Sequence, residues 1–186
     1  IMAEQLIKVA AQRQTANAEP LSIDDGPYAE FCDRFGFVET EDQFNAIADV
    51  VGDLASGKAT DRLICGDVGF GKTEVALRAA FIAAMSGYQV ALVAPTTLLA
   101  RQHGRVFAER FAGFPIKIGV LSRMTATATA KQTRADMKTG DVQIVIGTHA
   151  LLAKSTRFNN LGLVIVDEEQ HFGVGQKERL KELRSD

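Results

Sequence analysis

The sequence predicts an α/β domain in which a mainly parallel sheet is flanked by helices. Short apolar runs alternate with helical stretches between residues 62 and 166, which is typical of parallel β–α–β units. The apolar runs lack a strict polar alternation, as expected for strands whose two faces are both covered. At 186 residues, the chain is long enough to form one domain with a sizeable core.

The predicted elements follow one another in a regular order along the chain. Strands are expected at 62–65, 89–94, 116–121, 142–147 and 161–166. Helices are expected between them at 72–86, 97–111 and 126–138. Because ligands of such sheets bind beyond the carboxyl ends of the strands, residues that directly follow each strand are the candidates for function.

The amino-terminal part of the chain is expected to lie outside this domain. Apolar residues recur at helical spacing over 2–14, and the stretch that follows, up to Tyr28, contains proline, glycine and acidic residues. We therefore predict a linker helix and connecting segment at 1–27, followed by the main lobe at 28–186.

The overall composition excludes several classes of protein. The formal net charge is −2, from 21 basic and 23 acidic residues, so any surface for nucleic acid must be a local one. Cys32 and Cys65 are too few for a disulfide framework and fit a reducing compartment. No run approaches the roughly 20 apolar residues of a membrane span, and no signal-peptide pattern is present. We expect a cytoplasmic protein without a membrane partner.

The stretch "GDVGFGKT" at 66–73 predicts a phosphate-binding loop, because it fits G-x-x-x-x-G-K-[ST] between a strand and a helix. Glycines let successive backbone N–H groups point at phosphate oxygens, and the helix start favours negative charge. Lys72 supplies a charge for the terminal phosphates, and Thr73 a hydroxyl for Mg²⁺. A chance glycine-rich turn is the alternative. The candidate nucleotide-binding residues are Gly66, Asp67, Val68, Gly69, Phe70, Gly71, Lys72, Thr73 and Glu74.

The stretch "LGLVIVDEEQ" places acidic residues directly after the last predicted strand. Asp167 is a candidate ligand for Mg²⁺, and Glu168 a candidate to polarise the attacking water. An acidic helix start is the alternative, since carboxylates favour helix N-termini. Together with the phosphate loop, the pair favours hydrolysis of a nucleotide over binding alone.

Gln43 has two candidate roles that are compatible with each other. With Thr40 it forms a predicted capping box at the start of a helix that is expected to end at Gly57. Its amide could also read adenine through a paired donor and acceptor, as amides do in nucleic-acid readout. Phe37 lies six residues earlier and could stack on the base.

Taken together, the motifs resemble those of superfamily 2 helicases and translocases. They are "FVETEDQ", "GDVGFGKTE", "APTTLLARQH", "IGTHALL" and "DEEQ", in the order of that superfamily. Within it, "LSRM" and "LGLVIVDEEQHFGVGQKERLK" are similar to the bacterial transcription-repair coupling factors (Mfd). The RecG-type branch-migrating helicase is the near alternative, although it usually has a small residue at the position of Phe70.

The resemblance implies a RecA-like P-loop NTPase lobe of a double-stranded DNA translocase that uses ATP and Mg²⁺. In the full-length protein it implies displacement of stalled RNA polymerase and recruitment of excision-repair proteins. It assigns the chemistry to Lys72, Asp167 and Glu168, with Gln170 coupling nucleotide state to a second lobe. It also implies contacts to DNA, mainly to phosphates, from Thr96, Thr97, Arg101, Gln102, His103, Ser122, Arg123, Gly147, Thr148 and His149.

Two alternatives to these assignments remain. The stretch "TTLLARQH" also fits a capped amphipathic helix whose Arg101 and His103 are solvated. The whole chain could instead be a stand-alone nucleotide-binding or oligomerising module that does no work on DNA.

The resemblance further implies a "TATP" motif and a second motor lobe beyond Asp186. The strand leading into "TATP" is expected between the phosphate-loop strand and the strand that ends at Asp167. We therefore expect a lobe that is incomplete at its C-terminus, with a gap in the sheet that another chain, a rearranged sheet or self-association covers. Direct pairing of those two strands would contradict this expectation. Alone, the chain is expected to hydrolyse ATP weakly or not at all.

Overall fold

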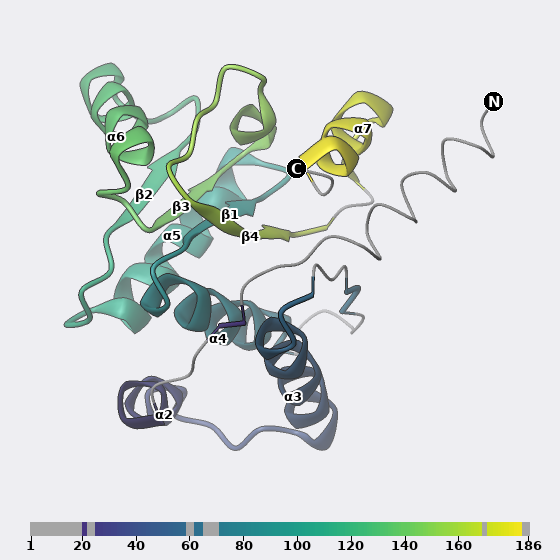
Figure 1. Ribbon diagram of the computed structural model, residues 1–186. Helices are drawn as coiled ribbons and strands as arrows, with labels where there is room; N and C mark the ends of the chain where they lie inside the picture. Colours follow the sequence, from purple (N-terminus) through teal and green to yellow (C-terminus); the bar gives the residue numbers. More distant parts are fainter. Residues whose placement is uncertain (1–19, 22–24, 59–61, 65–70, 169–170, 184–186) are drawn as a thin grey trace. The chain divides into compact units, whose positions relative to one another are not determined.

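The computed structural model describes residues 20–21, 25–58, 62–64, 71–168 and 171–183 (Figure 1). Three predicted features lie outside the described residues. They are the helix at 2–14, the body of the phosphate loop at 66–70, and Gln170. The chain divides into two compact units, Ile1–Ile82 with Lys181–Asp186, and Ala83–Leu180.

The unit Ala83–Leu180 contains a four-stranded parallel sheet in the order β2-β3-β1-β4. Its strands are β1 (Gln89–Val93), β2 (Ile118–Leu121), β3 (Ile144–Gly147) and β4 (Leu161–Val166). Val93 pairs with both Gly147 and Val166, so β1, β3 and β4 end level with one another. The predicted parallel α/β architecture is therefore confirmed.

The helices of this unit join the strands as predicted. α5 (Thr97–Phe111) packs against β2 and β3, and α6 (Thr127–Thr139) packs against β2. A short 3-10 helix η1 (His149–Leu152) follows β3, and α7 (Val174–Leu183) lies near the end of the chain. None of the helices in the described ranges has both the length and the apolar character needed to cross a bilayer.

The core of this unit lies on the two central strands. Every residue of β1 and β3 is buried, as the continuous apolar runs of these strands require. Along β4, by contrast, five of the six residues are only partly buried, and Gly162 is exposed. Among the described strands β4 pairs only with β1, at the end of the sheet order. The expected gap on its other side stays a prediction.

The second unit is described mainly by its helices α2 (Asp25–Asp33), α3 (Glu41–Ala55) and the first part of α4 (Lys72–Met85). Phe31 of α2 is fully buried and stacks on Phe81 of α4, with ring centroids 4.4 Å apart. The apolar face predicted for α3 is only partly used, because Ile47 is buried while Phe44 is 63% exposed.

Two expectations about this unit are corrected by the structure. Residues 25–28 belong to helix α2 rather than to a connecting segment, because proline is tolerated in a first helical turn and Phe31 supplies a buried anchor. α2 also crosses the predicted boundary between residues 27 and 28. The strand predicted at 62–65 is not formed at Arg62–Ile64, where no described strand pairs with the backbone and Leu63 is 77% exposed.

Candidate functional site

Of the predicted phosphate loop, the structure describes Gly71 and the two residues that follow it. Gly71 has a φ of +70°, in the left-handed region that favours glycine. Lys72 is the first residue of α4 and is exposed, and Thr73 follows it in the same turn, partly buried. The amino-terminal turn of a helix attracts anions. Lys72 and Thr73 therefore stand where phosphate-binding side chains are expected.

Gln43 forms the predicted capping box and also lies against Gly71. The Thr40 N–H donates to Gln43 Oε1 at 3.0 Å, and the Gln43 N–H donates to Thr40 Oγ1 at 3.2 Å. A Cβ atom built on Gly71 would stand 1.9 Å from Gln43 Nε2. The capping role is thus confirmed, and the role in reading adenine stays a prediction.

Phe37 has the exposure that a base-stacking residue needs. Its side chain is 79% exposed, and its ring meets that of Phe35 edge-on, with centroids 5.6 Å apart. Phe35 in turn lies 5.8 Å from the guanidinium of Arg78. The ring of Phe37 is therefore backed by protein and open to solvent, and its contact with a base stays a prediction.

Glu74 forms a buried ion pair with Arg78, which also pairs with Glu39, a residue that precedes α3. Its side chain is 2% exposed, and Arg78 Nε donates to Glu74 Oε1 at 2.7 Å. Arg78 also donates to Glu39, whose carboxyl pKa is lowered by this hydrogen bond. Burial opposes the charge of Arg78, but the two carboxylates raise its pKa. The roles of Arg78 and Glu39 were not predicted, although Glu74 and Arg78 show the i, i+4 charge spacing of a helix pair.

Asp167 stands at the carboxyl end of β4, where it was predicted to bind a metal. Its backbone N–H donates to the Val93 carbonyl at 2.9 Å, which extends the pairing of β4 with β1 by one residue. His103 Nε2 and Asp167 Oδ2 lie 2.7 Å apart, within hydrogen-bond distance. His103 was expected to face DNA, and its ring lies against the predicted metal ligand instead of in solvent. Contact between His103 and DNA stays a prediction.

Glu168 has an unusual backbone conformation for a residue with a side chain. Its φ is 51°, the only positive value among non-glycine residues in the described ranges. Such strain is concentrated at functional sites in proteins. The side chain is exposed, and His171 Nε2 lies 3.6 Å from Glu168 Oε2. An exposed carboxylate in this conformation is compatible with the predicted role of Glu168 in polarising the attacking water. That role stays a prediction.

The predicted magnesium ligands are of the chemical type that binds Mg²⁺ together with a nucleotide, and their role stays a prediction. Among the described residues, no cluster of three or more His, Cys, Asp or Glu could hold a metal ion by itself. Mg²⁺ in nucleotide sites takes one or two protein oxygens and completes its shell with phosphates and water. The carboxylate of Asp167 and the hydroxyl of Thr73 are oxygen donors of this kind.

The residues predicted to contact DNA follow the carboxyl ends of three neighbouring strands. Thr96 caps α5 after β1, with its side chain accepting from the Leu99 N–H at 3.2 Å. The predicted DNA-contacting residues after β2 and β3 differ in exposure. Arg123 and His149 are exposed, whereas Thr148 is only 8% exposed. The exposed members of the set are Thr96, Arg101, Gln102, Arg123 and His149. The partly buried members are Thr97, His103 and Ser122, and the buried members are Gly147 and Thr148.

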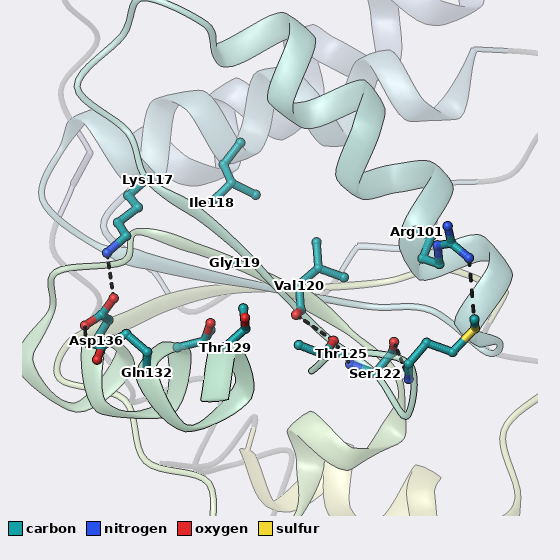
Figure 2. Close-up of a pocket in the computed structure, with 12 residues that line it drawn as sticks. Arg101, Lys117, Ile118, Gly119, Val120, Ser122, Thr125, Thr129, Gln132 and Asp136 are labelled. Atoms are coloured by element: carbon teal, nitrogen blue, oxygen red, sulfur yellow. Dashed lines mark hydrogen bonds and ion pairs between the residues drawn. The ribbon is translucent and has the colours of Figure 1, made fainter. Parts of the chain in front are cut away.

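A pocket of about 580 Å³ lies along β2 and includes two of these predicted DNA-contacting residues (Figure 2). At one end, Arg101 Nη1 lies 3.9 Å from Met124 Sδ, next to Ser122. At the other end, Lys117 Nζ donates to Asp136 Oδ2 at 2.6 Å. Sequence reasoning missed this pocket, because its two walls come from α5 and α6 on either side of β2.

Comparison with known proteins confirms the resemblance drawn from the motifs. Residues 40–186 match the DEAD/DEAH box helicase family. The chain is 51% identical to the transcription-repair-coupling factor of Rickettsia bellii, over 99% of this chain and 17% of that protein. It is 49% identical to that of Haemophilus influenzae and 47% identical to that of Bacillus subtilis, in each case over 99% of this chain and 16% of the relative.

Solved structures support the same fold class. RecG bound to a three-way DNA junction superposes with a TM-score of 0.81 and 36% identity, over 89% of this chain and 23% of that chain. A hypothetical ATP-dependent RNA helicase from Sulfolobus tokodaii superposes with a TM-score of 0.61 at 19% identity, over 82% of this chain and 44% of that chain, which shows the fold alone. The predicted RecA-like lobe is therefore confirmed, and the chain belongs to the DEAD/DEAH box helicase family.

Proposed function

We propose that this chain is the ATP-binding lobe of a double-stranded DNA translocase of the transcription-repair coupling type. One observation carries the proposal. The predicted metal carboxylate, Asp167, and the predicted DNA-contacting loops follow the ends of adjacent strands of one sheet. This arrangement supports the proposal, because a metal ligand and DNA contacts at one edge of the sheet would allow ATP hydrolysis to be coupled to movement on DNA.

The proposed chemistry divides among a few side chains. Lys72 and the loop amides bind the phosphates of ATP, while Thr73 and Asp167 hold Mg²⁺, which neutralises charge on the phosphates. Glu168 orients the attacking water, and Gln170 passes the nucleotide state to a second lobe. Phe37 and Gln43 hold the adenine. The residues at 96–97, 101–102, 122–123 and 147–149 contact DNA phosphates through side chains or backbone N–H groups, because a translocase must be indifferent to sequence.

The wider biology belongs to the complete protein. This chain spans about one sixth of the length of the coupling factors that it resembles. We infer from the resemblance of the motifs that the complete protein displaces stalled RNA polymerase and recruits excision-repair proteins in the cytoplasm. The name that its relatives share, transcription-repair-coupling factor, supports a link between transcription and repair. Along β4, five of the six residues are only partly buried, which supports the proposal that a further strand or a second copy of the chain covers this strand.

The test is ATP hydrolysis by the complete gene product with and without linear duplex DNA. We expect duplex DNA to stimulate hydrolysis, and Lys72→Ala to abolish hydrolysis at every DNA concentration. Lys131→Ala is the matched control, since Lys131 is an exposed lysine on α6 outside the predicted site. Hydrolysis that is independent of DNA, or full activity of Lys72→Ala, would contradict the proposal and favour a nucleotide-binding module without DNA work.

A RecG-type fork remodeller is the second candidate, favoured by the superposition on RecG bound to a three-way junction. The two candidates differ in the DNA that stimulates them. A coupling-type translocase is expected to respond to linear duplex as strongly as to branched DNA of equal length. Stimulation by three-way junctions that greatly exceeds stimulation by linear duplex would support the RecG-type candidate instead.

A further inference from the structure

We propose that His103 is a positioning residue that holds the Asp167 carboxylate in the orientation needed to receive Mg²⁺·nucleotide. The proposal rests on the proposed function, because it assumes that Asp167 binds the metal. It assigns His103 to the metal site, whereas the motif pattern placed it among the residues that face DNA.

The contact has the geometry of a strong hydrogen bond. His103 Nε2 and Asp167 Oδ2 are 2.7 Å apart, and the side chains are 16% and 32% exposed. An ionised carboxylate can only accept, so the Nε2 atom carries the proton and donates it. Hydrogen bonds of this kind fix the rotation of ligating carboxylates in metal sites.

The backbone on both sides of the contact is held independently of it. α5 starts directly after β1, and β1 pairs with β4, so the two residues are attached to neighbouring strands. The Asp167 N–H donates to the Val93 carbonyl and anchors the carboxylate side. On the histidine side, the next residue, Gly104, is buried so closely against Val120 that a Cβ would stand 2.7 Å from Val120 Cγ2.

This packing explains how a helix residue can act on the metal ligand. Because the backbone of α5 packs directly against β2 at Gly104, the ring of His103 is held beside Asp167 by the packing of the helix as well as by the hydrogen bond. A side chain that served mainly to contact DNA would need greater exposure, as Arg101 and Gln102 have on the same helix.

The experiment compares three variants of the complete protein. His103→Leu removes the donor, His103→Gln keeps an N–H donor near the same place, and Glu109→Gln alters an exposed residue of α5. The readouts are Mn²⁺ affinity in the presence of ADP, by electron paramagnetic resonance, and ADP affinity in EDTA. We expect His103→Leu to weaken Mn²⁺ binding about 10- to 100-fold, with most of the loss restored in His103→Gln. ADP affinity in EDTA should stay unchanged.

Three outcomes would overturn the proposal. Mn²⁺ affinity in His103→Leu equal to that in Glu109→Gln would show that the contact does not position the ligand. Equal losses in the leucine and glutamine variants, with a lowered unfolding temperature, would show a packing role. A loss of DNA affinity with unchanged Mn²⁺ binding would show a DNA contact. If the unaltered protein binds no Mn²⁺ with ADP, the proposed function itself fails, and this inference fails with it.

Discussion

At the scale of single residues, two positions with a left-handed backbone lie directly beside residues that the motifs mark. Gly71 takes a left-handed φ immediately before Lys72, and Glu168 takes a left-handed φ immediately after Asp167. Glycine adopts this conformation without cost, whereas a side-chain residue is strained there by about 1–2 kcal/mol. The strain at Glu168 must be offset by its surroundings, as is common at functional sites.

Asp136 provides a residue-scale prediction about pH. Lys117 and Gln132 donate to its carboxylate, and these hydrogen bonds lower the pKa of Asp136 below its ordinary value of 3.8. A lowered folded-state pKa stabilises the fold above the unfolded-state value, and this stabilisation is lost as the pH falls through the folded-state value. We expect Asp136→Asn to speed amide hydrogen exchange in α6 at neutral pH, and its difference from the unaltered protein to disappear as the pH falls below the lowered pKa of Asp136.

The measurement is hydrogen exchange by mass spectrometry on the complete protein, at several pH values and corrected for intrinsic rates. Lys117→Met removes the partner and should produce the same pattern. A difference between Asp136→Asn and the unaltered protein that does not shrink as the pH is lowered step by step below 3.8 would show that the ion pair is not its source.

At the scale of elements, local signals placed most boundaries. The predicted helix at 97–111 and strand at 161–166 have the same bounds in the structure, since a cap or an apolar run marks each of them. The strand predicted at 62–65 shows where local signals fail. Arg62–Ile64 are apolar enough for a strand, but a strand also needs a hydrogen-bonding neighbour, which no local pattern supplies.

The capping box of α3 provides a prediction at this scale. Thr40→Ala removes the hydroxyl that accepts from the Gln43 N–H, and loss of such a cap costs about 1 kcal/mol. We expect roughly fivefold faster hydrogen exchange in the first turn of α3, with the exchange of α5 unaltered. Thr40→Ser keeps the hydroxyl and is the matched control. Unchanged exchange in Thr40→Ala would show that the cap does not hold this helix start.

At the scale of the whole molecule, charge balance limits how the chain can hold DNA. The net charge is −2, and the exposed cations among the predicted DNA-contacting residues include Arg101 and Arg123. Most of the remaining contacts would come from hydroxyl groups and backbone N–H groups. These groups carry no charge, so they displace few counterions from the DNA phosphates. The salt dependence of DNA binding contributed by this lobe should therefore be shallow.

Arg123→Ala tests this charge argument in the complete protein. Removing one phosphate contact should reduce the slope of log affinity against log salt by about 0.9, and by the same amount for every DNA sequence. Binding to fluorescent duplexes at several salt concentrations measures the slope, with Lys131→Ala as the control. A slope that is unchanged in Arg123→Ala would place the DNA away from the carboxyl end of β2.

The sequence by itself determined the alternation of strands and helices, the capping box of Thr40 and Gln43, and the family. Each of these depends on residues close together in the chain, whose spacing is visible in the sequence. Only the tertiary structure decided that His103 holds Asp167, and that Arg78 joins Glu39 to Glu74. The first contact spans 64 positions and the bond from Arg78 to Glu39 spans 39, so each forms only after folding brings distant segments together.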